Sequence, residues 1–207
     1  ETAFENRYCL ERMGLIASRK MLDLGCGAGE AAVYFARQGA DVCATDLSGG
    51  MLRVAAQLAE RHGCRIDTVK SSAEELPFED ESFDIVYGAN VLHHVDIPAT
   101  LDQVHRILRP GGQAFFIEPL TYNPVIKVYR RMAKTVRTED EHPLRRSDLA
   151  LFEERFSEVT HKEMWLFTLY IFIWFFLVER VHPSKARYWK KVIRDAHKHR
   201  FGIGIAC

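Results

Sequence analysis

Residues 20–30 read KMLDLGCGAGE, a short apolar strand that runs directly into a turn with three glycines. Glycine lets the backbone adopt left-handed conformations and approach a ligand closely. Residues 30–38 then have a helical composition and stop at Gly39, a typical C-terminal helix signal. This strand–turn–helix unit predicts the start of a parallel α/β sheet with a ligand-binding turn.

The rest of residues 1–118 repeats the alternation of strand and helix. The predicted helices are 1–19, 30–38, 51–62 (capped by Ser48) and 101–108, with an Arg-Pro-Gly-Gly turn at 109–112. The predicted strands are nearly all apolar, which is typical of a parallel sheet covered by helices on both faces. They are Lys20–Leu24, Asp41–Thr45, Arg65–Lys70, Phe83–Tyr87 and Gln113–Glu118.

The pattern changes after residue 118. We expect a helix at 124–134, a charged loop at 137–146, a sixth strand at 156–165 and a last strand at 201–207. The prediction is therefore an α/β, doubly wound, mostly parallel sheet of seven strands with a helical C-terminal elaboration. Residues 1–118 would form a ligand-binding core, and residues 119–207 a lid or substrate-binding part.

Composition narrows the class of protein. The chain is 47% hydrophobic and 27% charged, as expected for a globular protein. Its zero net charge hides an asymmetry, because residues 1–118 carry 11 basic and 18 acidic side chains and residues 119–207 carry 17 and 10. The acidic half is a poor nucleic-acid surface, whereas the basic half either meets an anionic partner or is solvated.

Cysteine usage and the N-terminus bear on localisation. Five cysteines, an odd number without a Cys-x-x-Cys pair, predict a reduced intracellular protein. No signal-peptide pattern is visible, so we expect a cytoplasmic protein. We expect no bound metal.

The charges around the glycine turn select among ligands. The dinucleotide fingerprint Gly-x-Gly-x-x-Gly is broken, because Glu30 occupies the place of its third glycine. Glu30 and Asp23 would repel a pyrophosphate at the helix N-terminus. S-adenosylmethionine carries an ammonium and a sulfonium but no phosphate, so the acidic surroundings favour it over NAD.

Two aspartates of this region have alternative roles. Asp46, after the second strand, either accepts the two ribose hydroxyls of an adenosine ligand or caps a turn. Asp23 either shapes the turn as a buried, hydrogen-bonded carboxylate or contacts the ligand ammonium through water. For Asp23 the two roles are compatible.

Residues 18–118 resemble the class I (Rossmann-like) S-adenosylmethionine-dependent methyltransferases, specifically the small-molecule group. The resemblance rests on four blocks in the right order: DLGCGAGE, ATDLSGGML, SSAEELPFEDESFDIVYGANVLHHV and LDQVHRILRPGGQAFFIEP. Where that family usually has an acidic residue to bind the adenine amino group, this chain has Ser72, whose hydroxyl would accept the bond more weakly. The cofactor-binding residues that the resemblance implies are Asp23, Gly25, Cys26, Gly27, Asp46, Leu47, Met51, Ser72, Ala73, Glu74, Asn90 and Val91.

Methyl transfer from S-adenosylmethionine needs the nucleophile, the methyl group and the sulfur in line. Alignment of these atoms therefore supplies most of the catalysis. A general base is needed only when the nucleophile arrives protonated. His93 and His94 follow the fourth strand, where either is that base or a histidine that starts a helix. Glu118, at the carboxyl end of the fifth strand, is a candidate to contact substrate.

Residues 164–178 are almost uncharged and include seven aromatic residues. The run is too short to span a bilayer. It forms a core helix or homodimer face, lines a pocket for a lipophilic acceptor, or contacts a membrane surface peripherally. The last two alternatives favour a lipid-like, quinone-like or polyketide-like acceptor.

Two other functions compete with this interpretation. An RNA or DNA methyltransferase is disfavoured, because the Asp/Asn-Pro-Pro-aromatic motif of amino-directed enzymes and a Pro-Cys nucleophile are both absent. A non-catalytic S-adenosylmethionine-binding partner protein is disfavoured by the intact ligand motifs. The predicted function is methyl transfer to a small, lipophilic acceptor.

Overall fold

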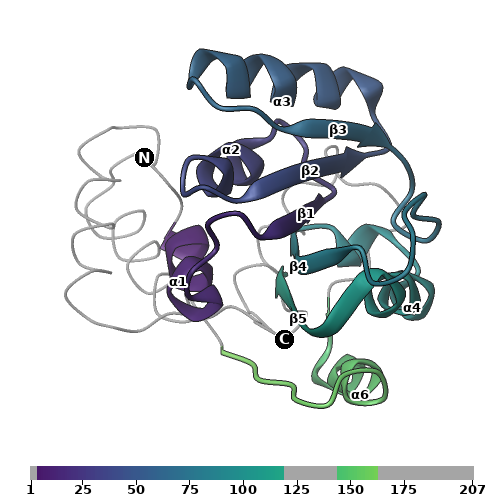
Figure 1. Cartoon of the computed structure of the whole chain (residues 1–207). Coiled ribbons are helices and arrows are strands. Elements are labelled where there is room, and N and C mark those ends of the chain that lie inside the picture. Colours follow the sequence, from purple (N-terminus) through teal and green to yellow (C-terminus); the bar gives the residue numbers. More distant parts are fainter. Residues whose placement is uncertain (1–3, 119–143, 163–207) are drawn as a thin grey trace, which may run out of the picture.

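The computed structural model describes residues 4–118 and 144–162 (Figure 1). Within them, five strands form one sheet in the order β3-β2-β1-β4-β5, and every neighbouring pair is parallel. The predicted doubly wound α/β fold is therefore confirmed. The strands are β1 Lys20–Leu24, β2 Asp41–Asp46, β3 Asp67–Lys70, β4 Phe83–Ala89 and β5 Leu108–Ile117.

The chain winds outward from β1 through β2 to β3, then returns to place β4 on the other side of β1. The carboxyl ends of β1 and β4 therefore lie side by side where the winding direction reverses, the usual ligand position in open α/β sheets. Because neighbouring strands are parallel, each crossover carries the chain from the carboxyl end of one strand back to the amino end of the next. All five strands therefore end at the same edge of the sheet.

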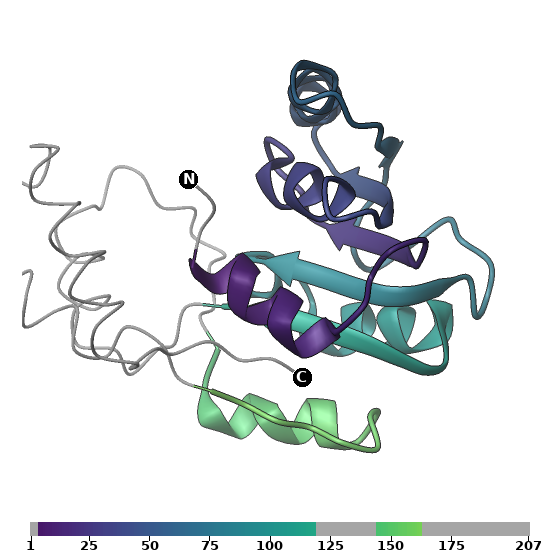
Figure 2. The same cartoon turned by 60° about the vertical axis from the view of Figure 1, so that its left-hand side comes forward.

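Helices cover both faces of the sheet (Figures 1 and 2). Strand side chains alternate between two clusters, one packed with α4 and α6 and the other with α1 and α2. Tyr87, pointing to the second face, donates a hydrogen bond of 2.5 Å to Asn6 of α1. The helices are α1 Phe4–Met13, α2 Glu30–Ala36, α3 Gly49–Arg61, α4 Ile97–Ile107 and α6 Leu149–Glu153, with 3-10 turns η1 Leu92–His94 and η2 Arg146–Asp148.

Three predicted boundaries need correction. The first helix ends at Met13, not at residue 19, because Gly14 takes a positive φ of 72°. Helix α4 begins at Ile97, since Asp96 caps it by accepting a bond of 2.8 Å from the Ala99 amide. The predicted turn at 109–112 lies inside β5, as an irregularity between the pairs Phe83↔Leu108 and Ile85↔Gln113.

The predicted sixth strand at 156–165 is wrong over its described residues. Residues 156–161 are not strand, and Lys162 forms only an isolated bridge. The chain here still closes the short helix α6, because the amides of Arg155 and Phe156 both donate to the Phe152 carbonyl. The predicted helix 124–134, the loop up to residue 143 and the last strand 201–207 lie outside the described residues. The seven-strand count and the domain division at residue 118 stay predictions.

Gly29 offers a stability test of the packing between α2 and α3. It has a φ of +81°, and an added Cβ would lie 2.5 Å from Ala55 Cβ and 2.8 Å from Ala55 Cα. We expect Gly29→Ala to lower the free energy of unfolding by about 3 kcal/mol, through left-handed strain and overpacking together. Urea denaturation monitored by circular dichroism measures the loss.

Gly63→Ala is the matched control. Gly63 also has a positive φ, of 65°, but an added Cβ would meet nothing within 4 Å. It should cost only the conformational penalty of about 1 kcal/mol. Equal losses in the two variants would contradict the packing argument.

Candidate active site

Two glycines of the first turn, Gly25 and Gly27, are required for different physical reasons. Gly25 has a φ of +66°, and a Cβ there would lie 2.7 Å from Val91 Cγ2 in the loop after β4. Gly27 has a φ of +52°, and a Cβ there would meet nothing within 4 Å. Gly25 therefore packs one loop against another, whereas Gly27 presents backbone to open space where a ligand could approach.

Asp46 joins this turn to the start of α3. Its Oδ2 accepts a hydrogen bond of 2.9 Å from the Gly27 amide, and its Oδ1 accepts one of 2.8 Å from the Ser48 amide. Ser48 in turn caps α3 by accepting from the Met51 amide, as predicted. Each Asp46 oxygen keeps a second lone pair, so a turn role and a ribose role are compatible.

Asp23 is a buried carboxyl under the turn. Its pKa is raised to about 7, mainly by burial and to a smaller extent by the negative charge of Asp46, while a backbone hydrogen bond from Ala32 opposes the rise. Among the described residues its Oδ2 has no hydrogen-bond partner. Burial, followed by the charges of Asp23 and Asp46, likewise raises the pKa of the Cys26 thiol to about 12. Both shifts mark a place that disfavours additional negative charge.

Exposed apolar side chains lie on the α3 side of the turn. Leu47 is 65% exposed and Met51 is 45% exposed, unusual for side chains of this size. The loop carrying Ser72 and Ala73 begins beside them, because Asp46 pairs with Lys70 at the end of β3. The resemblance places Ser72 at the adenine amino group, and Leu47, Met51 and Ala73 belong to the cofactor-binding set that it implies.

Glu74, another residue of the implied cofactor-binding set, bonds to the start of a helix. Its Oε1 accepts a hydrogen bond of 3.2 Å from the Asp96 amide at the start of α4. This contact ties the loop after β3 to that helix.

Glu118 and His93, two of the three predicted catalytic residues, form a buried pair. His93 Nδ1 lies 2.7 Å from Glu118 Oε2. Glu118 Oε1 accepts two further hydrogen bonds, of 2.7 Å from the Val91 amide and 2.8 Å from the Leu92 amide. The Glu118 side chain is fully buried, so this carboxylate fixes both the imidazole and the loop after β4.

The third candidate, His94, is exposed, and its ring centroid lies 4.0 Å from that of His93. Asn90, also exposed, turns the chain with a φ of +57°. Sequence reasoning placed Glu118 toward a substrate and did not foresee its bonds to the loop after β4. The sequence signal for these bonds was the position of Glu118, an acidic residue directly after the strand that pairs with β4.

A cavity among the described residues lies away from this edge of the sheet. It has a volume of about 460 Å³ and contains no predicted site residue. It is lined by Tyr8, Arg12, Gly111–Phe115 and residues 156–158 and 160–162. Within residues 4–118 and 144–162, no group of three or more potential metal ligands gathers. No helix in that part of the chain is long and apolar enough to cross a membrane.

Comparison with known families decides the class. A family described as "Methyltransferase domain" matches residues 22–116. The match covers slightly less than half of the 207-residue chain and agrees with the resemblance to class I methyltransferases. Methyltransferases of this class are S-adenosylmethionine-dependent. The stretch includes most of β1 and of β5, all of β2 to β4, and the glycine turn.

Individual relatives agree with this assignment. The chain is 36% identical over 124 residues to the ubiquinone biosynthesis O-methyltransferase of Aliivibrio fischeri strain MJ11, covering 59% of this chain and 52% of that protein. It is 38% identical over 107 residues to a ubiquinone/menaquinone biosynthesis C-methyltransferase of Bartonella tribocorum, covering 48% and 40%. The chain thus spans about half the length of the curated relatives it matches.

Solved structures show the same fold. The YcgJ protein of Bacillus subtilis superposes with a TM-score of 0.65 at 20% identity, covering 98% of this chain and 93% of that one. A SAM-dependent methyltransferase from Aquifex aeolicus superposes with a TM-score of 0.61 at 19% identity, covering 78% and 84%. At these identities the likeness shows the fold alone.

The raised pKa of Asp23 predicts a pH dependence of stability. The group is protonated in the folded protein up to about pH 7 but ionises near 3.8 when unfolded, so its stabilising contribution is lost as pH rises toward 7. We expect Asp23→Asn to remove this dependence. Relative to the variant, the wild type should lose roughly 2–3 kcal/mol of unfolding free energy between pH 5 and pH 8.

Urea denaturation of both proteins at the two pH values measures the difference. The comparison cancels every other titrating group that the two proteins share. A constant gap between wild type and variant across this range would contradict the pKa shift of Asp23.

Proposed function

We propose that this chain is an S-adenosylmethionine-dependent methyltransferase that acts on a small, lipophilic, quinone-like acceptor. The observation that carries the proposal is the acidic, open glycine turn at the carboxyl edge of β1. Asp46 accepts a hydrogen bond from the Gly27 amide, and Asp23 lies close enough to Cys26 to raise the pKa of its thiol. A Cβ added at Gly27 would meet nothing within 4 Å, so the turn is open there. A cationic ligand without phosphate fits this environment, and a pyrophosphate does not.

The residues present fit the cofactor along its whole length. The turn at 25–27 would take the methionine part, with Asn90 and Val91 beside it and the buried Asp23 linked to the ammonium through water. Asp46 would accept the ribose hydroxyls with its spare lone pairs. Leu47 and Met51 would cover the adenine, with Ser72 and Ala73 at its edge. When bound, the cofactor supplies the activated methyl group.

The acceptor class rests on the curated relatives. They are named for ubiquinone biosynthesis, and both O- and C-methyltransferases are among them. The aromatic run 164–178, outside the described residues, is our candidate for a wall of the acceptor pocket, a homodimer face or a peripheral membrane contact. We propose a cytoplasmic protein for which nucleic acid is not the substrate.

His93 and Glu118 suit a hydroxyl acceptor. With Nδ1 held by Glu118, the imidazole presents Nε2 as the proton-accepting nitrogen. His93 would take the proton of the acceptor hydroxyl as its oxygen gains the methyl group. Glu118 would stabilise the resulting imidazolium, as a carboxylate behind a catalytic histidine does.

Cofactor binding tests the first part of the proposal. We expect the wild-type chain to bind S-adenosylhomocysteine, and Asp46→Asn to weaken that binding about tenfold or more, because the ribose loses a charged acceptor. Isothermal titration calorimetry measures both dissociation constants. Asp41→Asn, at the exposed amino end of the same strand, is the matched control and should bind like wild type. Absence of binding by the wild type would refute the cofactor assignment.

Methyl transfer to lipophilic catechols and phenols, followed with labelled S-adenosylmethionine, tests the second part. We expect His93→Gln to lower kcat by about 10²–10⁴-fold, the usual contribution of a general base. Cofactor affinity should stay within about twofold. His105→Gln, on α4 with its ring packed against Phe156, should retain activity. Unchanged kcat in the His93 variant would rule out the base.

A further inference from the structure

The connection from β3 to β4 is a long crossover without a helix. It runs over residues 71–82 from the carboxyl end of β3 to the amino end of β4, past two intervening strands. It has no strand or helix of its own to pair its backbone groups. The proposed adenine contacts, Ser72 and Ala73, lie at its start, so their position depends on what holds this segment.

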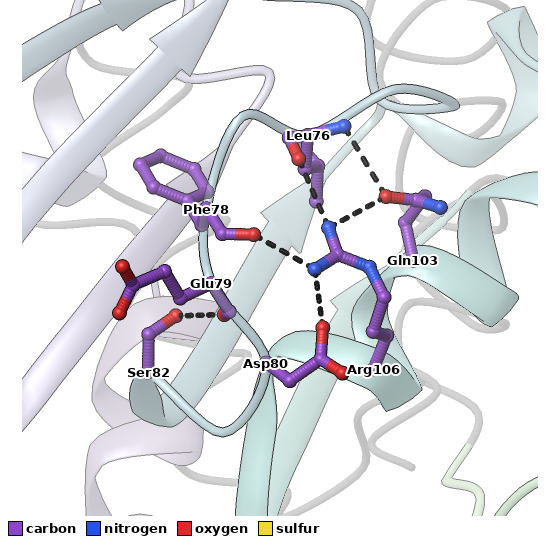
Figure 3. A network of polar contacts seen from close by, with 7 residues as sticks. All are labelled: Leu76, Phe78, Glu79, Asp80, Ser82, Gln103 and Arg106. Carbon is purple, nitrogen blue, oxygen red and sulfur yellow. Dashed lines mark hydrogen bonds and ion pairs between the residues drawn. The ribbon is translucent and has the colours of Figure 1, made fainter.

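Arg106 of α4 holds the middle of the crossover (Figure 3). Its Nη1 donates to the Phe78 carbonyl at 2.7 Å, and its Nη2 donates to the Leu76 carbonyl at 2.9 Å. The two carbonyls are two residues apart, so one planar guanidinium fixes the path of the chain between them. A forked donor suits this task, and a lysine ammonium would not reproduce its geometry.

Other groups of α4 extend the attachment along the segment. Gln103 Oε1 accepts from Arg106 Nη2 at 2.9 Å and from the Leu76 amide at 3.4 Å. The carbonyls of Arg106 and Ile107 accept from the amides of Glu81 and Ser82 at 3.0 and 2.8 Å. At the other end, the Asp96 amide donates to Glu74. The helix and its cap therefore bond the crossover at several points from Glu74 to Ser82.

The ion pair in this network is the weaker part of it. Arg106 Nη1 lies 2.8 Å from Asp80 Oδ1, but the Asp80 side chain is 74% exposed. Exposed ion pairs contribute little, because water screens them. The contacts with the carbonyls of Leu76 and Phe78 are partly buried, so their loss would leave polar groups without partners. Positioning of the segment thus rests on the carbonyls.

We propose that Arg106 is a positioning residue for cofactor recognition: by fixing the path of residues 76–78 it holds Ser72 and Ala73 at the adenine. This inference rests on the proposed function. Arg106 itself lies on α4 and acts through the crossover. Without Arg106, the path that binds the cofactor is one of several that the crossover adopts. The apparent affinity for the cofactor then falls in proportion to the fraction of molecules in that path.

The experiment measures S-adenosylhomocysteine binding to the full chain by calorimetry. We expect Arg106→Gln to raise the dissociation constant about tenfold, and Arg106→Lys to recover only part of this loss. Asp80→Asn should bind like wild type. Hydrogen exchange of residues 74–80 in the free protein should increase in the Arg106 variants and not in the Asp80 variant.

Arg109→Gln is the matched control. Arg109 also bonds a loop carbonyl and a carboxylate, those of Glu81 and Asp84, but at the amino end of β4. It should lower thermal stability without weakening cofactor binding. Circular dichroism at the titration temperature confirms that each variant is folded. If Arg106→Gln does not fold, Gln103→Ala, which removes an acceptor of the Leu76 amide and of Arg106, takes its place as the test variant.

The outcomes separate this inference from the proposed function. Wild-type binding with a tenfold loss only in the Arg106 variants supports it. Equal affinity of Arg106→Gln and wild type overturns it while leaving the cofactor assignment intact. Equal losses in the Arg106 and Arg109 variants would show a merely structural role and also overturn it. Absence of binding by the wild type refutes the proposed function, and the inference with it.

Discussion

Parallel pairing of all five strands is the constraint on which the rest of the structure depends. It forces every crossover to carry the chain back across the sheet, so the strand ends Leu24, Asp46, Lys70, Ala89 and Ile117 meet at one edge. Residues far apart in sequence, such as Gly25 and Val91, are thereby brought into contact. The glycine turn, the carboxylate Asp46 and the histidine His93 share that edge because each lies at or just after the carboxyl end of a strand.

The loops at this edge are stabilised by one recurring device. A carboxylate at the end of one strand accepts two backbone amides from the loops around it. Asp46 accepts from Gly27 and Ser48, and Glu118 accepts from Val91 and Leu92. Hydrogen bonds to charged groups contribute roughly 1.5–3 kcal/mol each. Each carboxylate therefore fixes the conformation of a loop that local sequence preferences do not determine. The same groups add negative charge where a cationic ligand would bind.

The sequence predicted the elements whose signals are local. Strands β1 and β2, helix α2 and the Ser48 cap follow from apolar runs, glycine and capping residues within a few positions of one another. The predicted turn at 109–112 failed because Pro-Gly-Gly suits an irregularity inside a strand as well as a turn. The strand predicted from Phe156 failed because that residue's amide still bonds back to α6. Both errors concern pairing, which composition does not encode.

The candidate site divides in the same way. Its members could be named from motifs, whereas many of their contacts join residues 19 to 30 positions apart, as in Asp46 with Gly27 and Arg106 with Leu76. Relatives named as O- and as C-methyltransferases each match about half of this chain, so likeness to them does not by itself identify the nucleophile that is methylated. We infer that particular side chains at the carboxyl edge of the sheet make this selection. A base held by a buried carboxylate is useful only when the acceptor carries a proton to be removed, and we propose that His93, held by Glu118, is such a base.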